Sequence, residues 1–175
     1  MPYMHKAIFG AGCFWGVELT FSKIDGVEST AVGYCGGSVP DPTYEIVCTG
    51  QSGHAEVVLV EFDPDKVSYD SLLDTFWSLH DPTTLNRQGA DEGTQYRSVI
   101  MYHNEEQMAA AGKWKIEVAK EHVDPIVTEI VEAPVFYPAE ADHQDFFRRN
   151  PYHGYCSIVI RPKLEKVKKV QEKEK

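Results

Sequence analysis

The pentapeptide Gly-Cys-Phe-Trp-Gly at residues 12–16 constrains the fold more than any other part of this chain. It follows a short apolar run at 6–9 that has β-strand character. It also begins a segment over 14–24 whose apolar side chains recur every three or four residues. The sequence therefore predicts a strand, a tight glycine turn and a helix, with Cys13 at the first helical turn.

Cys13 stands where a thiol can act as a nucleophile. Helix N-termini carry unpaired N–H groups and a partial positive charge, which can lower the pKa of a cysteine. Phe14 and Trp15 beside it would supply an apolar, aromatic wall for a small uncharged group. The same pattern also fits a buried and inert cysteine in a strand–helix turn, because free cysteine is among the most buried residue types.

Size and charge narrow the class of protein. The chain has 175 residues, 42% of them hydrophobic, which is enough for one domain with one core. We expect that domain to span 1–175, with residues 161–175 as a charged tail. The formal net charge of −10 repels phosphate backbones, so we expect no nucleic-acid partner.

The apolar segments are too short for membrane insertion or export. No run approaches the roughly 18 apolar residues of a transmembrane helix, and we expect no membrane association. The apolar run before Cys13 is shorter than the roughly 7–15 residues of a signal peptide. These observations favour a cytoplasmic location, where cysteines are usually buried or catalytic.

The four cysteines and seven histidines do not predict a metal site. No two cysteines have Cys-x-x-Cys spacing, and the histidines lack metal-ligand spacing relative to one another or to the cysteines. We therefore expect no metal. The cysteines are Cys13, Cys35, Cys48 and Cys156.

The pattern of elements predicts an α+β fold. Strands and helices alternate irregularly, and several strands are joined without a helix, which favours a two-layer sandwich over a doubly wound parallel sheet. We expect a mixed sheet with packed helices, a ferredoxin-like core and a long, loop-rich C-terminal segment. Strands are predicted at 3–9, 29–35, 54–62, 97–102, 127–132 and 157–160, and helices at 14–24, 69–80, 105–121 and 140–149.

Glu56 lies on the apolar face of a predicted strand. Strict alternation over 54–62 places it on the same face as Val58 and Val60. A carboxylate there is costly unless it is paired or protonated, and burial raises its pKa toward that of a proton donor near neutral pH. Alternatively, Glu56 lies at the open end of the strand and points to water.

Several further residues could contribute to a site. Tyr44 and Tyr96 lie in loop-like contexts where a phenol can donate a hydrogen bond, although each taken alone fits a packing or surface position better. Cys156 follows a Pro- and Gly-containing turn that could bring a second thiol to another site. His143 is the best alternative base for Cys13, but the spacing does not fix their distance.

Cys35 is predicted to be a bystander. Alternation places it on the face of Ala31 and Gly33, away from Val32 and Tyr34. The small residues on that face indicate tight packing against a helix, where a buried thiol stays neutral and inert. The glycines that follow it could instead let Cys35 move toward another thiol.

Seven segments, taken in order, resemble the A-type peptide-methionine sulfoxide reductases over about residues 6 to 160. They are Gly12-Cys-Phe-Trp-Gly-Val-Glu, Gly33-Tyr-x-Gly-Gly, Asp41-Pro-Thr-Tyr-Glu, Gly53-His-Ala-Glu, His80-Asp-Pro, Gly93-Thr-Gln-Tyr-Arg-Ser and Asp142-His-Gln. That family has a mixed α+β sandwich fold, which agrees with the pattern of elements.

The resemblance implies a role for each matching position. For the chemical steps it implies the nucleophile at Cys13, the acid that protonates the sulfoxide oxygen at Glu56, and the recycling thiol at Cys156. For substrate binding it implies a pocket for the methyl group at Phe14 and Trp15. It also implies hydrogen-bonding phenols at Tyr44 and Tyr96 and a polar residue of the substrate site at Asp91.

The resemblance also implies the reaction. Cys13 would attack the sulfur of methionine S-sulfoxide and become a sulfenic acid, which Cys156 would convert to a disulfide. Thioredoxin or a similar dithiol would then reduce that disulfide, with no metal or organic cofactor. Two other interpretations remain at this point. One is a cysteine hydrolase that uses Cys13 and His143, and the other is a non-enzymatic module that binds methionine-like side chains.

Overall fold

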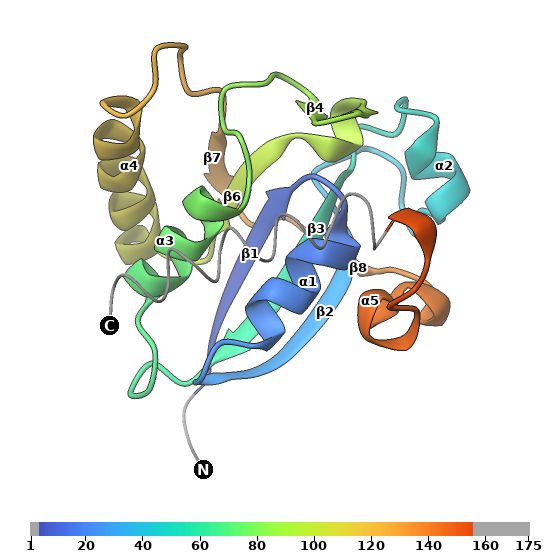
Figure 1. Ribbon diagram of the computed structural model, residues 1–175, viewed down its shortest axis with the longest axis horizontal. Coiled ribbons are helices and arrows are strands. Elements are labelled where there is room, and N and C mark those ends of the chain that lie inside the picture. Colours follow the sequence, from blue (N-terminus) through green and yellow to red (C-terminus); the bar gives the residue numbers. More distant parts are fainter. Residues whose placement is uncertain (1–3, 156–175) are drawn as a thin grey trace.

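The computed structural model describes residues 4–155. Cys156, the predicted strand at 157–160 and the tail at 161–175 lie outside the described residues. Figure 1 shows a mixed sheet with helices packed against it. Its strands in spatial order are β7 (Glu129–Glu132), β6 (Ser98–Tyr102), β1 (His5–Ala11), β3 (Ala55–Phe62), β2 (Val27–Cys35) and β8 (Tyr137–Pro138).

The four central strands form the expected ferredoxin-like core. Neighbours in the order β6-β1-β3-β2 are antiparallel, and β7 pairs with β6 in parallel, so the whole sheet is mixed. The chain passes from β1 to β2 through α1 (Phe14–Ser22) and from β3 to β6 through α3 (Tyr69–Leu79). Strands β1 and β2 therefore leave a gap that β3 fills, which is the split βαβ arrangement.

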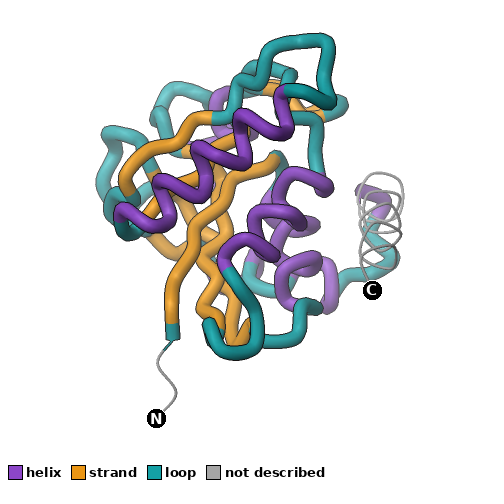
Figure 2. The backbone as a smooth tube through the Cα atoms, turned by 90° about the vertical axis from the view of Figure 1, so that its left-hand side faces the viewer, coloured by secondary structure: helices purple, strands orange, loops and turns teal. Residues whose placement is uncertain are grey.

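Helices cover one face of the sheet, and Figure 2 shows this layer beside the strands. Helices α1, α3 and α4 (Glu105–Ala119) supply side chains to the main apolar cluster. Phe9 of β1 lies at its centre, with its ring stacked on Phe21 at 5.0 Å and on Phe76 at 5.3 Å between centroids. Truncating a buried phenylalanine of this kind to alanine typically costs about 3–5 kcal/mol.

Side-chain caps begin the two longest helices. Ser68 accepts a hydrogen bond from the backbone N–H of Ser71 at 3.0 Å, and Asn104 accepts one from Gln107 at 2.8 Å. Each cap satisfies one of the unpaired N–H groups of a first helical turn. Within the described residues, no helix combines the length and the apolar character that crossing a membrane requires.

The structure differs from the prediction mainly in short elements. The loop after β2 contains the five-residue helix α2 (Tyr44–Cys48), capped by Thr43. Residues 81–95, for which no helix or strand was predicted, contain a small hairpin of β4 (Arg87–Gln88) and β5 (Asp91–Glu92), followed by η1 (Thr94–Tyr96).

The predicted helix at 140–149 is divided. It consists of η2 (Ala141–His143) and α5 (Phe146–Arg149). Asp145 lies between them with φ of +55°, in the left-handed region, so the chain cannot continue as one α-helix.

Cys35 is buried on the opposite face of the sheet from the helices. It belongs to a smaller apolar cluster with Ala55, Val57 and Met101, and burial raises the pKa of its thiol to about 12. The expectation that a helix packs on this face was wrong. The connection that contains Phe136 covers it, and a Cβ on Gly33 would come within 2.6 Å of the Phe136 ring.

We predict that Cys35 takes no part in thiol exchange. In folded protein, N-ethylmaleimide should leave Cys35 unmodified both before and after treatment with a sulfoxide substrate, because the thiol is buried and neutral. Peptide mapping after unfolding should recover it as a free thiol. Finding Cys35 in the main disulfide of the substrate-treated protein would contradict this prediction.

Candidate active site

Cys13 lies at the junction of β1 and α1, as predicted. It is the N-cap residue of α1, a free thiol of intermediate exposure. Gly12 before it has φ of +95°, and a Cβ there would lie 3.0 Å from Gln88, so the turn requires glycine. The backbone N–H of Trp15 donates a hydrogen bond to the Cys13 sulfur.

The predicted lowering of the Cys13 pKa was wrong for the resting site. Burial raises the pKa of this thiol well above its usual value, and the negative charges of Glu56 and then Asp91 raise it further. The Trp15 N–H and the Tyr155 hydroxyl act in the opposite direction but do not prevail. Desolvation of the thiolate therefore outweighs the helix N-terminus, and the resting group is a thiol.

Glu56 is buried on the helix-covered face of β3, in agreement with the alternation of that strand. Only 2% of it is exposed, and the backbone N–H of Phe14 donates to its Oε1 at 3.2 Å. Its Oε2 is buried and makes no hydrogen bond among the described residues. Burial raises the pKa of Glu56 to about 8, so the group is a neutral acid at pH 7.

The raised pKa of Glu56 predicts that the difference in unfolding free energy between Glu56→Gln and the unsubstituted protein changes with pH. Between about pH 4.5 and 8 the folded state holds a proton on Glu56 that the unfolded chain has lost, so stability falls as pH rises through this range. Glu56→Gln removes that loss. Its stability relative to the unsubstituted protein should rise by up to about 1.4 kcal/mol per pH unit. Urea unfolding at pH 5, 6.5 and 8 measures the trend, and a constant difference would contradict it.

Tyr44 and Tyr96 approach Glu56 from two different elements. Tyr44 is the first residue of α2 and Tyr96 is the last residue of η1. Burial raises the pKa of both phenols, and the charge of Glu56 raises both further. Each hydroxyl therefore remains a protonated hydrogen-bond donor next to the buried acid.

Tyr155 is a part of the site that the sequence did not indicate. Its hydroxyl donates a hydrogen bond to the carboxylate of Asp91, and its side chain is also hydrogen-bonded to Cys13. Asp91, on β5, is thereby held near the thiol. The only sequence signal was the position of Tyr155 directly before Cys156, which itself lies outside the described residues.

The predicted aromatic pair divides between the core and the surface. Phe14 is 1% exposed, with its ring 5.7 Å from that of Tyr34. Trp15 is partly exposed, and its indole stacks on Phe146 at 3.8 Å and meets the edge of Tyr155 at 5.8 Å. Trp15 therefore forms an apolar wall at the side of the site that is open to solvent.

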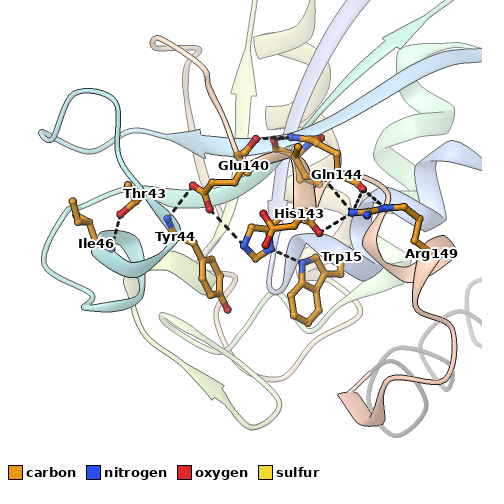
Figure 3. Close-up of polar contacts among 12 residues, drawn as sticks. Trp15, Thr43, Tyr44, Ile46, Glu140, His143, Gln144 and Arg149 are labelled. Atoms are coloured by element: carbon orange, nitrogen blue, oxygen red, sulfur yellow. Dashed lines mark hydrogen bonds and ion pairs between the residues drawn. The ribbon is translucent and has the colours of Figure 1, made fainter.

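His143 lies beside this wall but is not paired with Cys13. Its Nδ1 accepts a hydrogen bond from the Trp15 indole at 3.1 Å, and its Nε2 lies 3.5 Å from the Glu140 carboxylate (Figure 3). Both ring nitrogens are thus engaged away from the thiol, which removes the geometric basis for a Cys13–His143 hydrolase.

Cys48 is a second thiol close to the predicted site. It is exposed at the end of α2 and its side chain is hydrogen-bonded to Tyr44. Burial and the charges of Glu56 and Glu140 raise its pKa, whereas the Tyr44 hydrogen bond lowers it. No role was predicted for Cys48, and its place beside Tyr44 follows from the short helix α2, which was not predicted either.

The whole described domain resembles known enzymes in sequence. The profile of the peptide methionine sulfoxide reductase family matches residues 5–175. The "Peptide methionine sulfoxide reductase MsrA" of Nautilia profundicola is 53% identical over 172 residues, which cover 98% of this chain and 99% of the relative. The MsrA of Methanothermobacter thermautotrophicus is 61% identical over 148 residues, which cover 83% of this chain and 88% of the relative.

Solved structures agree with the sequence comparison. Mxr1 from Saccharomyces cerevisiae in its reduced form has a TM-score of 0.83 at 35% identity, covering 87% of this chain and 89% of Mxr1. Methionine sulfoxide reductase A of Corynebacterium diphtheriae has a TM-score of 0.80 at 36% identity, covering 87% of this chain and 78% of the other. Mxr1 in complex with Trx2 has a TM-score of 0.59 at 26% identity, covering 82% of this chain and 84% of Mxr1. This chain belongs to the peptide methionine sulfoxide reductase family.

Proposed function

We propose that this protein reduces the S epimer of methionine sulfoxide, in peptides and proteins and as the free amino acid, with Cys13 as nucleophile and Glu56 as acid. One observation carries the assignment of residues. A thiol at a helix N-terminus lies close to a buried, neutral carboxylic acid, one oxygen of which has no partner among the described residues. A sulfoxide supplies what both groups lack, because its sulfur is electrophilic and its oxygen accepts hydrogen bonds.

In the first step the substrate oxygen accepts hydrogen bonds from Glu56, Tyr44 and Tyr96. These donors draw electron density from the sulfur and stabilise the negative charge that develops on oxygen. The Glu56 proton passes to that oxygen. The carboxylate left behind can then take the proton of the Cys13 thiol, whose pKa it already influences.

The sulfur of Cys13 then attacks the sulfoxide sulfur. This attack forms an S–S bond to the substrate, which still carries the protonated oxygen. The hydroxyl group then moves to the Cys13 sulfur: the substrate S–O bond and the S–S bond break, an S–O bond forms on Cys13, methionine leaves as the thioether, and Cys13 becomes a sulfenic acid. Oxygen is transferred from one sulfur to the other, so this step needs no other reductant. Phe14 and Trp15 hold the methyl group of the substrate, and Asp91 orients the site through its hydrogen bond with Tyr155.

Two further steps restore the thiol. Cys156 attacks the sulfenic acid, which releases water and leaves a Cys13–Cys156 disulfide. Thioredoxin or a similar dithiol then reduces that disulfide by exchange and becomes oxidised itself. The position of Tyr155 against Asp91 and Cys13 supports this assignment, because Cys156 is the next residue along the chain. The complex of the similar Mxr1 with Trx2 supports the choice of reductant.

We further propose a single catalytic domain over 1–175, with 161–175 as a charged tail. The support is that one six-stranded sheet joins β1, near the start of the described residues, with β7 and β8, late in the chain, and that the family profile extends through residue 175. A reducing compartment such as the cytoplasm fits the proposed cycle, because Cys13 must return to a thiol after every turnover.

Removal of Cys156 tests the cycle. Cys156→Ser should still release about one methionine per chain when mixed with excess peptide sulfoxide, because oxygen transfer needs only Cys13. It should then stop with thioredoxin as the reductant, with a steady-state rate reduced by about 10²-fold or more. Rapid-quench chromatography of methionine measures both phases.

Cys35→Ala is the matched control, because it removes another thiol, one that is buried on the far face of the sheet. It should retain both the first turnover and steady-state activity. Undiminished thioredoxin-dependent turnover by Cys156→Ser would refute the assignment of Cys156. Absence of methionine release from the unsubstituted protein with either thioredoxin or dithiothreitol would refute the proposed function itself.

A further inference from the structure

His143 and Glu140 link the two walls of the proposed substrate site, which are Trp15 and Tyr44. His143 of η2 lies between Trp15 of α1 and Tyr44 of α2, as Figure 3 shows. Its Nδ1 accepts the Trp15 indole N–H at 3.1 Å, and its Nε2 lies 3.5 Å from Glu140 Oε2. The other oxygen of Glu140 accepts the backbone N–H of Tyr44 at 3.1 Å.

The contacts fix which atoms of the imidazole carry hydrogen. An indole N–H is only a donor, so Nδ1 of His143 must be the acceptor. The proton of the neutral ring is therefore on Nε2, directed at the Glu140 carboxylate. In the chain Trp15–His143–Glu140–Tyr44, Trp15 therefore donates to His143, and both His143 and the backbone N–H of Tyr44 donate to the Glu140 carboxylate.

The ring also packs against both walls. Its centroid lies 4.4 Å from that of Tyr44 and 5.9 Å from that of Trp15, and only 7% of His143 is exposed. A rotation of the Trp15 indole would leave a buried imidazole nitrogen without a donor, which is costly at this depth. The hydrogen bond therefore restricts the indole to one orientation.

Separate contacts hold the backbone around His143 in place. Gln144 pairs with both the N–H and the C=O of Val32, each at 2.9 Å. The backbone N–H of Asp145 donates to Glu18 at 2.6 Å. Because these contacts do not involve the imidazole, a substitution of His143 should leave this segment docked and change only what its side chain touches.

The same arrangement argues against a metal ion here. Glu140, Asp142 and His143 have donor atoms within 4.8 Å of one another. An imidazole that accepts at Nδ1 and donates at Nε2 has no lone pair left for a metal. A cation could bind through this histidine only by displacing the Trp15 indole or the proton shared with Glu140.

We propose that His143, supported by Glu140, is a positioning residue that sets the width of the methyl pocket by fixing the position of the Trp15 indole relative to Tyr44. The inference rests on the proposed roles of Trp15 and Tyr44 in substrate binding. It concerns how closely the pocket fits a methyl group, and the reaction steps themselves are unchanged.

The test compares methyl and ethyl sulfoxides. His143→Phe keeps a planar ring for stacking but removes the acceptor for Trp15 and the donor for Glu140. We expect kcat/KM for N-acetyl-methionine sulfoxide to fall about tenfold, the size of one lost buried hydrogen bond. The value for N-acetyl-ethionine sulfoxide should fall less than threefold, because a loosened wall admits the larger group.

His143→Asn is the conservative variant, because its side-chain oxygen can replace Nδ1 as the acceptor for the indole. It should recover at least half of the methyl-over-ethyl preference. His153→Phe is the matched control. The His153 ring lies at the same 5.9 Å from Trp15, but it is His143 that accepts the indole N–H. It should keep the preference within twofold of the unsubstituted value.

A double substitution separates this inference from the proposed role of Trp15. Trp15→Phe removes the indole donor, so adding His143→Phe in that background should change the preference by less than twofold. Equal losses on both sulfoxides in His143→Phe, or fully additive losses in the double variant, would overturn the inference. If Trp15→Phe alone left the preference unchanged, the proposed role of Trp15 would fail as well.

Discussion

Cys13→Ser should reduce methionine sulfoxide at least about 10⁴-fold more slowly than the unsubstituted protein, with thioredoxin or with dithiothreitol. A serine hydroxyl occupies the same N-cap position but is far less acidic and less nucleophilic than a thiol. The site already raises the pKa of the thiol, so it would deprotonate a serine hydroxyl even less readily. Single-turnover release of methionine from a peptide sulfoxide measures the effect without dependence on the recycling steps.

The comparison needs a control for folding and for contamination. Cys13→Ser should keep the urea midpoint of the unsubstituted protein within a few tenths of a molar, because Cys13 is partly exposed and a serine hydroxyl can accept the hydrogen bond that the Trp15 backbone N–H donates to the sulfur. Appreciable activity in this variant, purified from a host that lacks its own reductases of this kind, would exclude Cys13 as the nucleophile.

Substitution of Glu56 should separate proton donation from hydrogen bonding. Glu56→Ala removes both and should lower kcat by about 10²- to 10³-fold, the range found when one preorganised donor is lost. Glu56→Gln keeps an N–H donor for the substrate oxygen but cannot release a proton. It should therefore retain about tenfold more activity than Glu56→Ala, which corresponds to about 1.4 kcal/mol of transition-state stabilisation.

The rate ratio of the unsubstituted protein to Glu56→Gln should depend on pH. The acid must hold its proton to act, and burial raises the pKa of Glu56 to about 8. The advantage of the unsubstituted protein over Glu56→Gln should therefore be full at pH 6 and decline as pH rises through about 8. The quantity measured is the ratio of the two single-turnover rates at each pH. A ratio that stays constant from pH 6 to 9, or equal activity of the Gln and Ala variants, would contradict the assignment.

Local patterns predicted the positions of the two central groups. Apolar spacing of three and four residues after a glycine turn placed Cys13 at the start of α1, and alternation in β3 placed Glu56 on the helix-covered face. Both features depend on periodicities of 3.6 and 2 residues, which a single sequence displays directly. The core strands and longer helices were predictable for the same reason.

The surroundings of these groups depend on contacts that the sequence does not display. Helix α2 has five residues and a single buried one, so it has no periodic signal, although Thr43 marks its start. The hydrogen bond between Trp15 and His143 joins positions 128 residues apart. The pKa of Cys13 is decided by its desolvation, which depends on the packing of the whole site.

The most direct test of the central claim locates the oxygen acceptor. A Cys48→Ser/Cys156→Ser double variant removes the proposed recycling thiol and the second thiol near the site. It is mixed with excess peptide sulfoxide and no reductant, then trapped with dimedone and mapped by mass spectrometry. We predict about one methionine released per chain and one dimedone adduct, on the peptide that contains Cys13. Methionine release without an adduct at Cys13, or an adduct at Cys35 instead, would contradict the proposed mechanism.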